Sequence, residues 1–267
     1  MYTTKQSIII ISTFILLQSR IFSHQDSTKY IIGEYKSIQS NILNEERKLI
    51  IHLPANYPSS EEKFPVLYLL EGDWTFLIAT ALAHVLSEDN RVPKMIIIGI
   101  LNTDRLRDFL PTHVDQVPSS GGSDNFIRFM NEELIPFIDK KYCTKPSRIL
   151  FGASNSGLYV IYHLLKSPNS FDNYIAASPT VRHDDFFINK LTKDTFPNQE
   201  FDRKYLYITY GEQEGDWMIS PIQDYEKILK TKVSNEMIWK VQAFENEGHV
   251  PPTSLYEGLK FIYKSKQ

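Results

Sequence analysis

Residues 148–166 read RILFGASNSGLYVIYHLLK, and this stretch decides the fold. Residues 148–151 predict a short strand, residues 152–157 a tight turn, and residues 158–166 an amphipathic helix. A serine in such a turn exposes its hydroxyl as a nucleophile when small residues lie two positions before it and two after it. Here Gly152 and Ser156 flank Ser154, and Ser156 stands where the usual motif has a second glycine. The plainer interpretation is that Ser154 only caps the helix, a position that serine favours.

Strands and helices alternate on both sides of this stretch. The interior runs at residues 66–70 and 95–98 are continuously apolar, as in strands that helices cover on both faces. Residues 125–140 repeat apolar side chains at helical spacing. The other expected strands are residues 47–53, 65–70, 95–101, 174–177, 204–210 and 237–244. The pattern predicts an α/β sandwich with a central, mostly parallel sheet flanked by helices, and a ligand crevice at the carboxyl ends of the strands.

Possible partners for the serine follow the last two expected strands. Three carboxylates, Glu212, Glu214 and Asp216, come after residues 204–210, and His249 comes after residues 237–244. The order serine, acid, histidine is the one in which a histidine base and its orienting acid follow the nucleophile in this kind of sheet. Glu214 is the preferred acid and Asp216 the alternative. Taken singly, the carboxylates can form a solvated acidic loop, and His249 can be a surface residue.

Composition excludes several other classes of protein. The 267 residues carry 29 Lys plus Arg against 32 Asp plus Glu, a net charge of -3, which gives no basic surplus for nucleic acid. Cys143 is the single cysteine, so neither an internal disulfide nor a zinc site of several thiolates can form. His113 and His183 are far apart in sequence and lack metal-ligand spacing. We therefore expect no metal and no nucleic-acid partner.

The N-terminus indicates the compartment. Residues 1–23 combine a positive charge at Lys5, an apolar run of about eleven residues and a small residue at Ser23, the pattern of a secretory signal peptide. The alternative is an uncleaved anchor, although the run is shorter than the roughly 20 residues that span a bilayer. We expect residues 24–267 to form one exported domain, periplasmic or secreted, with no stable membrane insertion after cleavage.

Four further motifs complete a resemblance to a known family. They are the segments 64–72, 99–112, 120–138 and 174–179, which together with the serine turn resemble the esterase family of α/β hydrolases. That family includes ferric enterobactin esterases, other siderophore esterases, feruloyl esterases and mycolyltransferases. The resemblance spans residues 47–263 and implies an α/β-hydrolase fold and a cofactor-free serine esterase acting on small esters, with siderophore-type lactones the leading class.

The resemblance also implies roles for individual residues. Ser154 would attack the ester carbonyl, His249 would act as base and then acid, and Glu214 would orient His249. Backbone N–H groups of Asn155 and of the turn at Asp73 and Trp74 would hold the oxyanion.

Less specific candidates remain beside this set. Arg107 either meets an anionic substrate or forms a structural ion pair with Asp108, and Trp217, like Trp74, lies where it can line the pocket. Two other functions use the same scaffold: a catalytically weak binding protein, suggested by Ser156, and an acyltransferase. The sequence does not determine the oligomeric state.

Overall fold

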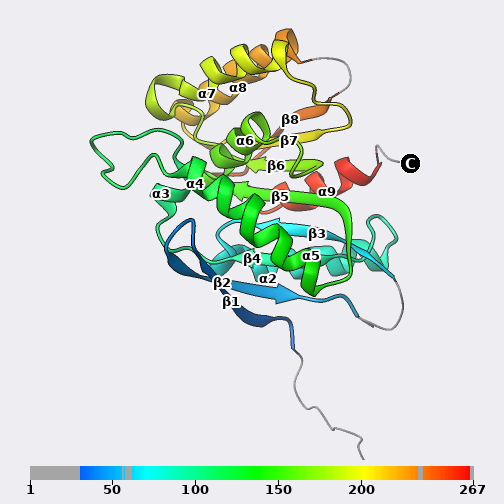
Figure 1. The fold of residues 1–267 in the computed structure, drawn as a ribbon. Coiled ribbons are helices and arrows are strands. Elements are labelled where there is room, and N and C mark those ends of the chain that lie inside the picture. The colour runs from blue at the N-terminus through cyan, green and yellow to red at the C-terminus, as the bar shows by residue number, and fades with distance from the viewer. Residues whose placement is uncertain (1–30, 56, 58–61, 234–236, 265–267) are drawn as a thin grey trace, which may run out of the picture. The chain divides into compact units, whose positions relative to one another are not determined.

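An eight-stranded mixed sheet is the centre of the fold in this computed structural model, which describes residues 31–55, 57, 62–233 and 237–264 (Figure 1). Contacts separate Met1–Ile31 from Ile32–Gln267, and every described helix and strand lies in the second unit. The predicted signal peptide, residues 1–23, falls outside the described residues.

The strands lie in the order β1-β2-β4-β3-β5-β6-β7-β8. β1 pairs antiparallel with β2 and β2 antiparallel with β4, whereas all the remaining pairs are parallel. The strand bounds are β1 Glu34–Ser40, β2 Glu45–His52, β3 Phe64–Leu69, β4 Ile96–Ile100, β5 Thr144–Ala153, β6 Asn173–Ala177, β7 Tyr205–Gly211 and β8 Ile238–Phe244. The mostly parallel sheet predicted from the sequence is confirmed, and β1 is an additional edge strand.

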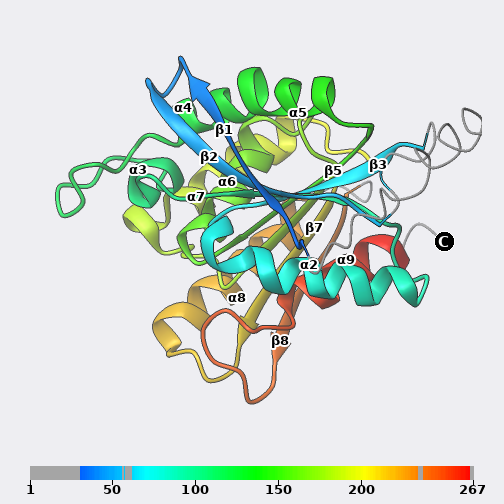
Figure 2. The ribbon, with the colours of Figure 1, turned by 90° about the horizontal axis from the view of Figure 1, so that it is seen from below.

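Helices cover both faces of the sheet. α2 and α9 pack against one face, and Figure 2 shows them on the side opposite to α4 and α5. The other helices, with α6 at their centre, enclose the larger apolar core on the second face. The helix bounds are α2 Gly72–Glu88, α3 Arg105–Phe109, α4 Ser123–Arg128, a π-helical turn η2 Phe129–Leu134, α5 Ile135–Lys141, α6 Asn155–Lys166, α7 His183–Thr195, a 3-10 turn η3 Phe196–Asn198, α8 Asp216–Lys232 and α9 Ser254–Lys264.

Burial explains why the central strands are so apolar. Every residue of β3, β4, β6 and β7 is buried, because helices exclude water from both faces there. β1 alternates between exposed and more buried residues and lies at the sheet edge. Among the described helices, none is long and apolar enough to cross a bilayer.

Candidate active site

Ser154 occupies the sharp turn between β5 and α6. Its backbone has φ 57° and ψ -118°, a conformation that costs a non-glycine residue on the order of 1–3 kcal/mol. Backbone hydrogen bonds hold it: Ser154 N donates to Ala177 O on β6 at 2.8 Å, and Ser154 O accepts from Leu158 N at 3.0 Å and from Thr180 N at 3.2 Å. A Cβ at Gly152 would overlap the carbonyl oxygen of Ser156, so only glycine fits two residues before the serine. The turn predicted from the sequence is present, and it is strained.

Glu214 and His249 meet beyond the carboxyl ends of β7 and β8. His249 Nδ1 lies 2.8 Å from Glu214 Oε2, and the Glu214 side chain is almost fully buried. The other carboxylate oxygen accepts hydrogen bonds from Ser178 Oγ at 2.5 Å and from Gly211 N at 2.8 Å. Because the carboxylate accepts from Nδ1, the second ring nitrogen of His249 is left for proton exchange.

The surroundings of Glu214 favour its charged form. Burial alone would raise its pKa, but the hydrogen bonds from His249, Ser178 and Gly211 N outweigh burial and lower the pKa below the ordinary glutamate value. Ser178 also accepts a hydrogen bond from Val250 N at 3.0 Å, next to the histidine. Ser178 was not predicted as a site residue. The only sequence signal for it is its position directly after β6 and before a proline.

The two other candidate acids lie elsewhere. Asp216 begins α8, is exposed, and accepts a hydrogen bond from Ser220 Oγ at 2.5 Å. Glu212 is also exposed, and its N–H donates to Phe244 O at 3.0 Å. Of the three carboxylates on this loop, the structure joins Glu214 to the histidine.

Ser154 and His249 line one pocket of about 480 Å³, together with Glu71, Trp74, Arg105, Ala153 and Val250. The hydrogen bonds of the described residues do not include one between Ser154 Oγ and the His249 ring. Catalytic hydrogen bonds of this type are often long before substrate binds and tighten in the complex.

Two helix N-termini begin directly beside residues that line this pocket. Asn155 is the first residue of α6, and Asp73 lies in the first turn of α2, where N–H groups have no intrahelical acceptor. The N–H of Trp74, the other donor expected in this turn, donates to Glu71 O at 3.2 Å. The Trp74 side chain lines the pocket, as expected.

Comparison with known proteins finds relatives of this chain. Residues 40–248 match the family model described as "Putative esterase". The chain belongs to this esterase family. It is 31% identical over 180 residues to the ferri-bacillibactin esterase BesA of Bacillus subtilis, a match that covers 60% of this chain and 62% of that protein. It is 33% identical over 140 residues to a siderophore enterobactin esterase of Emericella nidulans, a match that covers 43% of this chain and 46% of that protein.

Solved structures agree with this assignment. An IroE-like serine hydrolase from Shewanella oneidensis superposes with a TM-score of 0.83 at 26% identity, covering 88% of this chain and 81% of that one. The matches to the two curated esterases span less than two thirds of those proteins' lengths. The α/β-hydrolase fold predicted from the sequence is confirmed.

In this esterase-family chain, Arg107 does not line the pocket. It contacts Glu45 through Nη2 at 2.6 Å and Asp108 through Nε at 2.8 Å, and the hydrogen bond to Glu45, ahead of that to Asp108, raises the pKa of the guanidinium. The fully buried Arg47 on β2 joins the same network at 2.7 Å from Asp108. Of the two roles expected for Arg107, these contacts favour the structural ion pair with Asp108 over contact with substrate.

Arg105 takes the place at the pocket expected for Arg107. Residues two apart on a helix do not share a face, so α3 can direct Arg107 into the ion-pair network and Arg105 into the pocket. The Arg105 side chain is 40% exposed, and its Nε donates to Glu71 Oε1 at 2.7 Å. The sequence analysis missed Arg105 because both arginines stand in the same motif.

Trp217 is not among the residues that line the pocket. It lies in the first turn of α8, is 59% exposed, and its ring lies 5.2 Å from the Arg182 guanidinium carbon. This cation–π contact accounts for its position without a substrate.

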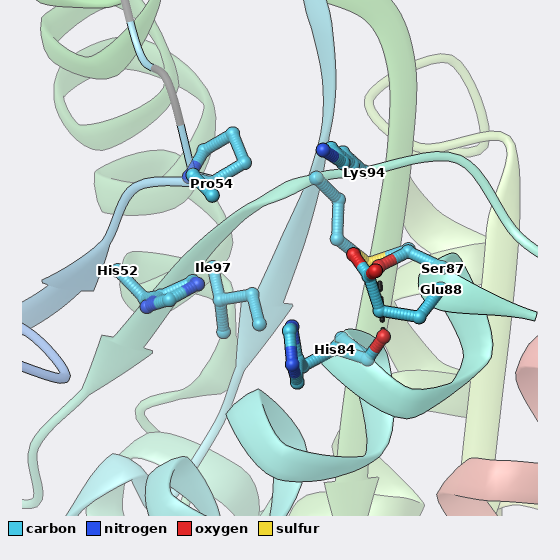
Figure 3. Close-up of a pocket in the computed structure, with 10 residues that line it drawn as sticks. His52, Pro54, His84, Ser87, Glu88, Lys94 and Ile97 are labelled. Carbon is cyan, nitrogen blue, oxygen red and sulfur yellow. Dashed lines mark hydrogen bonds between the residues drawn. The ribbon is translucent and has the colours of Figure 1, made fainter.

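A second, smaller hollow of about 30 Å³ lies at the opposite end of the sheet (Figure 3). Its lining includes His52, His84, Glu88 and Lys94, around the end of β2 and the last turns of α2. His52 Nδ1 contacts the backbone oxygen of Ile32 at 2.6 Å. Within the described residues, no group of three or more histidine, cysteine or acidic side chains is placed to hold a metal ion.

Proposed function

We propose that this protein is a serine esterase that hydrolyses carboxylic esters through an acyl-enzyme intermediate on Ser154. One observation carries the proposal: a buried, hydrogen-bonded carboxylate, Glu214, holds His249 at the pocket that Ser154 lines. The strained backbone of Ser154 supports the same role, since such strain persists where the surrounding structure enforces it. Membership of the esterase family makes ester hydrolysis the leading chemistry.

The reaction follows from this arrangement. The Ser154 hydroxyl attacks the ester carbonyl while the free ring nitrogen of His249 takes its proton. Negative charge then develops on the carbonyl oxygen, where the N–H groups of Asn155 and Asp73 donate to it. His249 returns the proton to the departing alcohol, and the ester carbon stays bonded to Ser154 Oγ. Water attacks this acyl-enzyme in the same way, and the acid and the free serine are released.

Glu214 contributes by keeping its charge beside the histidine. The lowered pKa keeps the carboxylate ionised at neutral pH, so that it fixes the ring orientation and stabilises the imidazolium. Changing an equivalent acid to its amide lowers kcat by roughly 10⁴-fold in a serine protease. We therefore expect Glu214→Gln to lose most activity and Asp216→Asn, the matched control on the same loop, to retain it.

For the substrate, we infer small esters, with siderophore-type lactones first. The support is that curated relatives include a ferri-bacillibactin esterase and a siderophore enterobactin esterase. A siderophore whose backbone is joined by esters should be cleaved, and one joined by amides should not. We also propose that the domain at residues 24–267 is exported after removal of residues 1–23, which fractionation and N-terminal sequencing of the mature protein would test.

Labelling with a fluorophosphonate probe, followed by peptide mapping, tests the assignment directly. We expect covalent label on Ser154, no label on Ser154→Ala, and greatly slowed labelling of His249→Ala. Each variant should retain the circular dichroism spectrum of the wild type. Absence of label on folded wild-type protein would refute the esterase and favour a binding protein. Rapid acylation with hydrolysis accelerated by an added alcohol would identify an acyltransferase instead.

A further inference from the structure

We propose that Glu71 and Ser156 form a positioning pair that joins the nucleophile turn to the oxyanion turn, so that the serine in the motif's second glycine position raises turnover. This inference rests on the proposed esterase function. Neither residue is assigned a chemical step; both act through the backbone groups that contact the substrate.

Ser156 is fully buried and its hydroxyl is fully used. Ser156 Oγ lies 2.7 Å from Glu71 Oε2 and accepts a hydrogen bond from Ala153 N at 2.7 Å. Ala153 O lies 2.8 Å away as a second acceptor, but a hydrogen bond to a carboxylate is the stronger of the two. The hydroxyl therefore connects the end of β5, directly before Ser154, to the carboxylate of Glu71.

Glu71 stands at the other half of the site. It follows β3, adopts the left-handed conformation with φ 56° and ψ 47°, and directly precedes α2, whose first turn supplies the Asp73 N–H. A Cβ at Gly72 would lie 2.6 Å from the backbone of Gly99 on β4, so the start of α2 is pressed against the sheet. The side chain of Glu71 is thus fixed at the base of the oxyanion turn.

The second carboxylate oxygen of Glu71 reaches the pocket wall. Arg105 Nε donates to Glu71 Oε1 at 2.7 Å, while Ser156 occupies Oε2. Glu71 is only 4% exposed, and a buried carboxylate is stable when its oxygens are hydrogen-bonded and a cation compensates its charge. One carboxylate therefore connects three chain segments that lie far apart in sequence and line one pocket.

The Glu71–Ser156 hydrogen bond affects the distance between the two backbone donors proposed for the oxyanion. Asn155 N and Asp73 N belong to different segments, and the Glu71–Ser156 hydrogen bond is a direct side-chain link between those segments. With glycine at position 156 the link is lost and Glu71 retains only Arg105. Positioning of this kind acts on the transition state, so its loss should lower kcat while KM stays nearly constant.

The test compares Ser156→Gly, which creates the usual motif, with Glu71→Gln and the double variant, using a short p-nitrophenyl ester. We expect Ser156→Gly to lower kcat by roughly 10- to 100-fold, below the ~10²–10³-fold typical of deleting one oxyanion donor, with KM changed by less than about twofold. The double variant should lose about as much as the more impaired single variant, because both changes break one link.

Ser123→Gly is the matched control. Ser123 is also a fully buried serine in the first turn of a helix, and its Oγ donates to Asp108 O at 3.0 Å, away from the residues that line the pocket. It should lose stability without losing kcat. If Ser156→Gly fails to fold, Ser156→Ala gives the same comparison, with folding checked by circular dichroism.

The outcomes separate this inference from the proposed function. Active wild-type enzyme with an equally active or faster Ser156→Gly overturns the positioning pair and leaves the esterase standing. Losses that multiply in the double variant, or that fall on KM, also overturn it. Wild-type protein that neither hydrolyses the ester nor takes label on Ser154 overturns both.

Discussion

We expect the buried His163 to make the folded protein less stable in acid. It lies on α6, is fully buried, and within the described residues both ring nitrogens have no hydrogen-bond partner. Aromatic rings surround it, with Phe171, Tyr159 and Tyr174 at centroid distances of 5.0, 5.8 and 6.3 Å. Burial lowers its pKa from 6.5 to about 3, because the protonated ring cannot be solvated there.

The sign and size of the effect follow from that shift. The unfolded chain binds a proton at His163 below pH 6.5 while the folded chain stays neutral down to about pH 3, so the free energy of unfolding falls as pH drops through this window. At 1.36 kcal/mol per pKa unit, the full loss is about 5 kcal/mol, and roughly 3 kcal/mol of it occurs between pH 7.5 and 4.5. Because α6 also carries Asn155, this loss of folding would remove hydrolysis as well.

Urea unfolding at pH 7.5 and 4.5 measures this contribution. Other groups also titrate, so the useful quantity is the difference between the wild type and His163→Leu, a replacement of similar volume. We expect the variant to lose about 3 kcal/mol less than the wild type over this interval. His84→Leu, at an exposed histidine on α2, should behave as the wild type does. Equal losses for the wild type and His163→Leu would refute the reasoning.

Two further predictions concern buried charge and close packing. Asp108→Ala should lower the free energy of unfolding by about 1–3 kcal/mol in urea titrations, because the fully buried Arg47 loses its nearer carboxylate at 2.7 Å and keeps only Glu45 at 2.9 Å; a loss well below 1 kcal/mol would contradict it. Gly152→Ala should abolish fluorophosphonate labelling, since the added Cβ overlaps Ser156 O and the turn cannot close. Gly248→Ala, where a Cβ has no neighbour within 4 Å, should label normally, and equal labelling of both variants would show that the turn adapts.

Local sequence signals predicted the elements well where burial is complete on both faces. β3, β4, β6 and β7 were predicted within about two residues of their bounds because every residue in them is buried, which leaves an apolar run in the sequence. β1 was missed because it lies at the sheet edge and is largely exposed, so its sequence EYKSIQS contains only one large aliphatic residue.

The candidate site was predictable as an order of residues and not as a set of contacts. Ser154, Glu214 and His249 follow β5, β7 and β8, which are parallel, and the topology of such a sheet brings those positions to one edge. The choice between Arg105 and Arg107 depended instead on Glu45, a carboxylate on a distant strand whose pairing with Arg107 no local pattern encodes. The role of Glu71 was hidden for the same reason, since its partners lie 34 and 85 residues away.

Several strained backbone positions lie at or beside the pocket, and their residue types conceal them. Glu71, Ser154, Ser178 and Val250 all have positive φ, between 44° and 60°, in a region where glycine is the usual residue. Each costs on the order of 1–3 kcal/mol and persists only if its surroundings enforce it. Those surroundings are hydrogen bonds. Glu71 is held by Ser156 and Arg105, and Ser154 is held by the neighbouring strand β6. Ser178 donates to Glu214 and accepts from Val250 N. At Glu71 and Ser178 the side chain itself makes these hydrogen bonds, so glycine there would relieve the strain and also remove the links. A site built in this way has little freedom to rearrange before substrate binds, which is the condition under which fixed backbone donors stabilise a transition state most effectively.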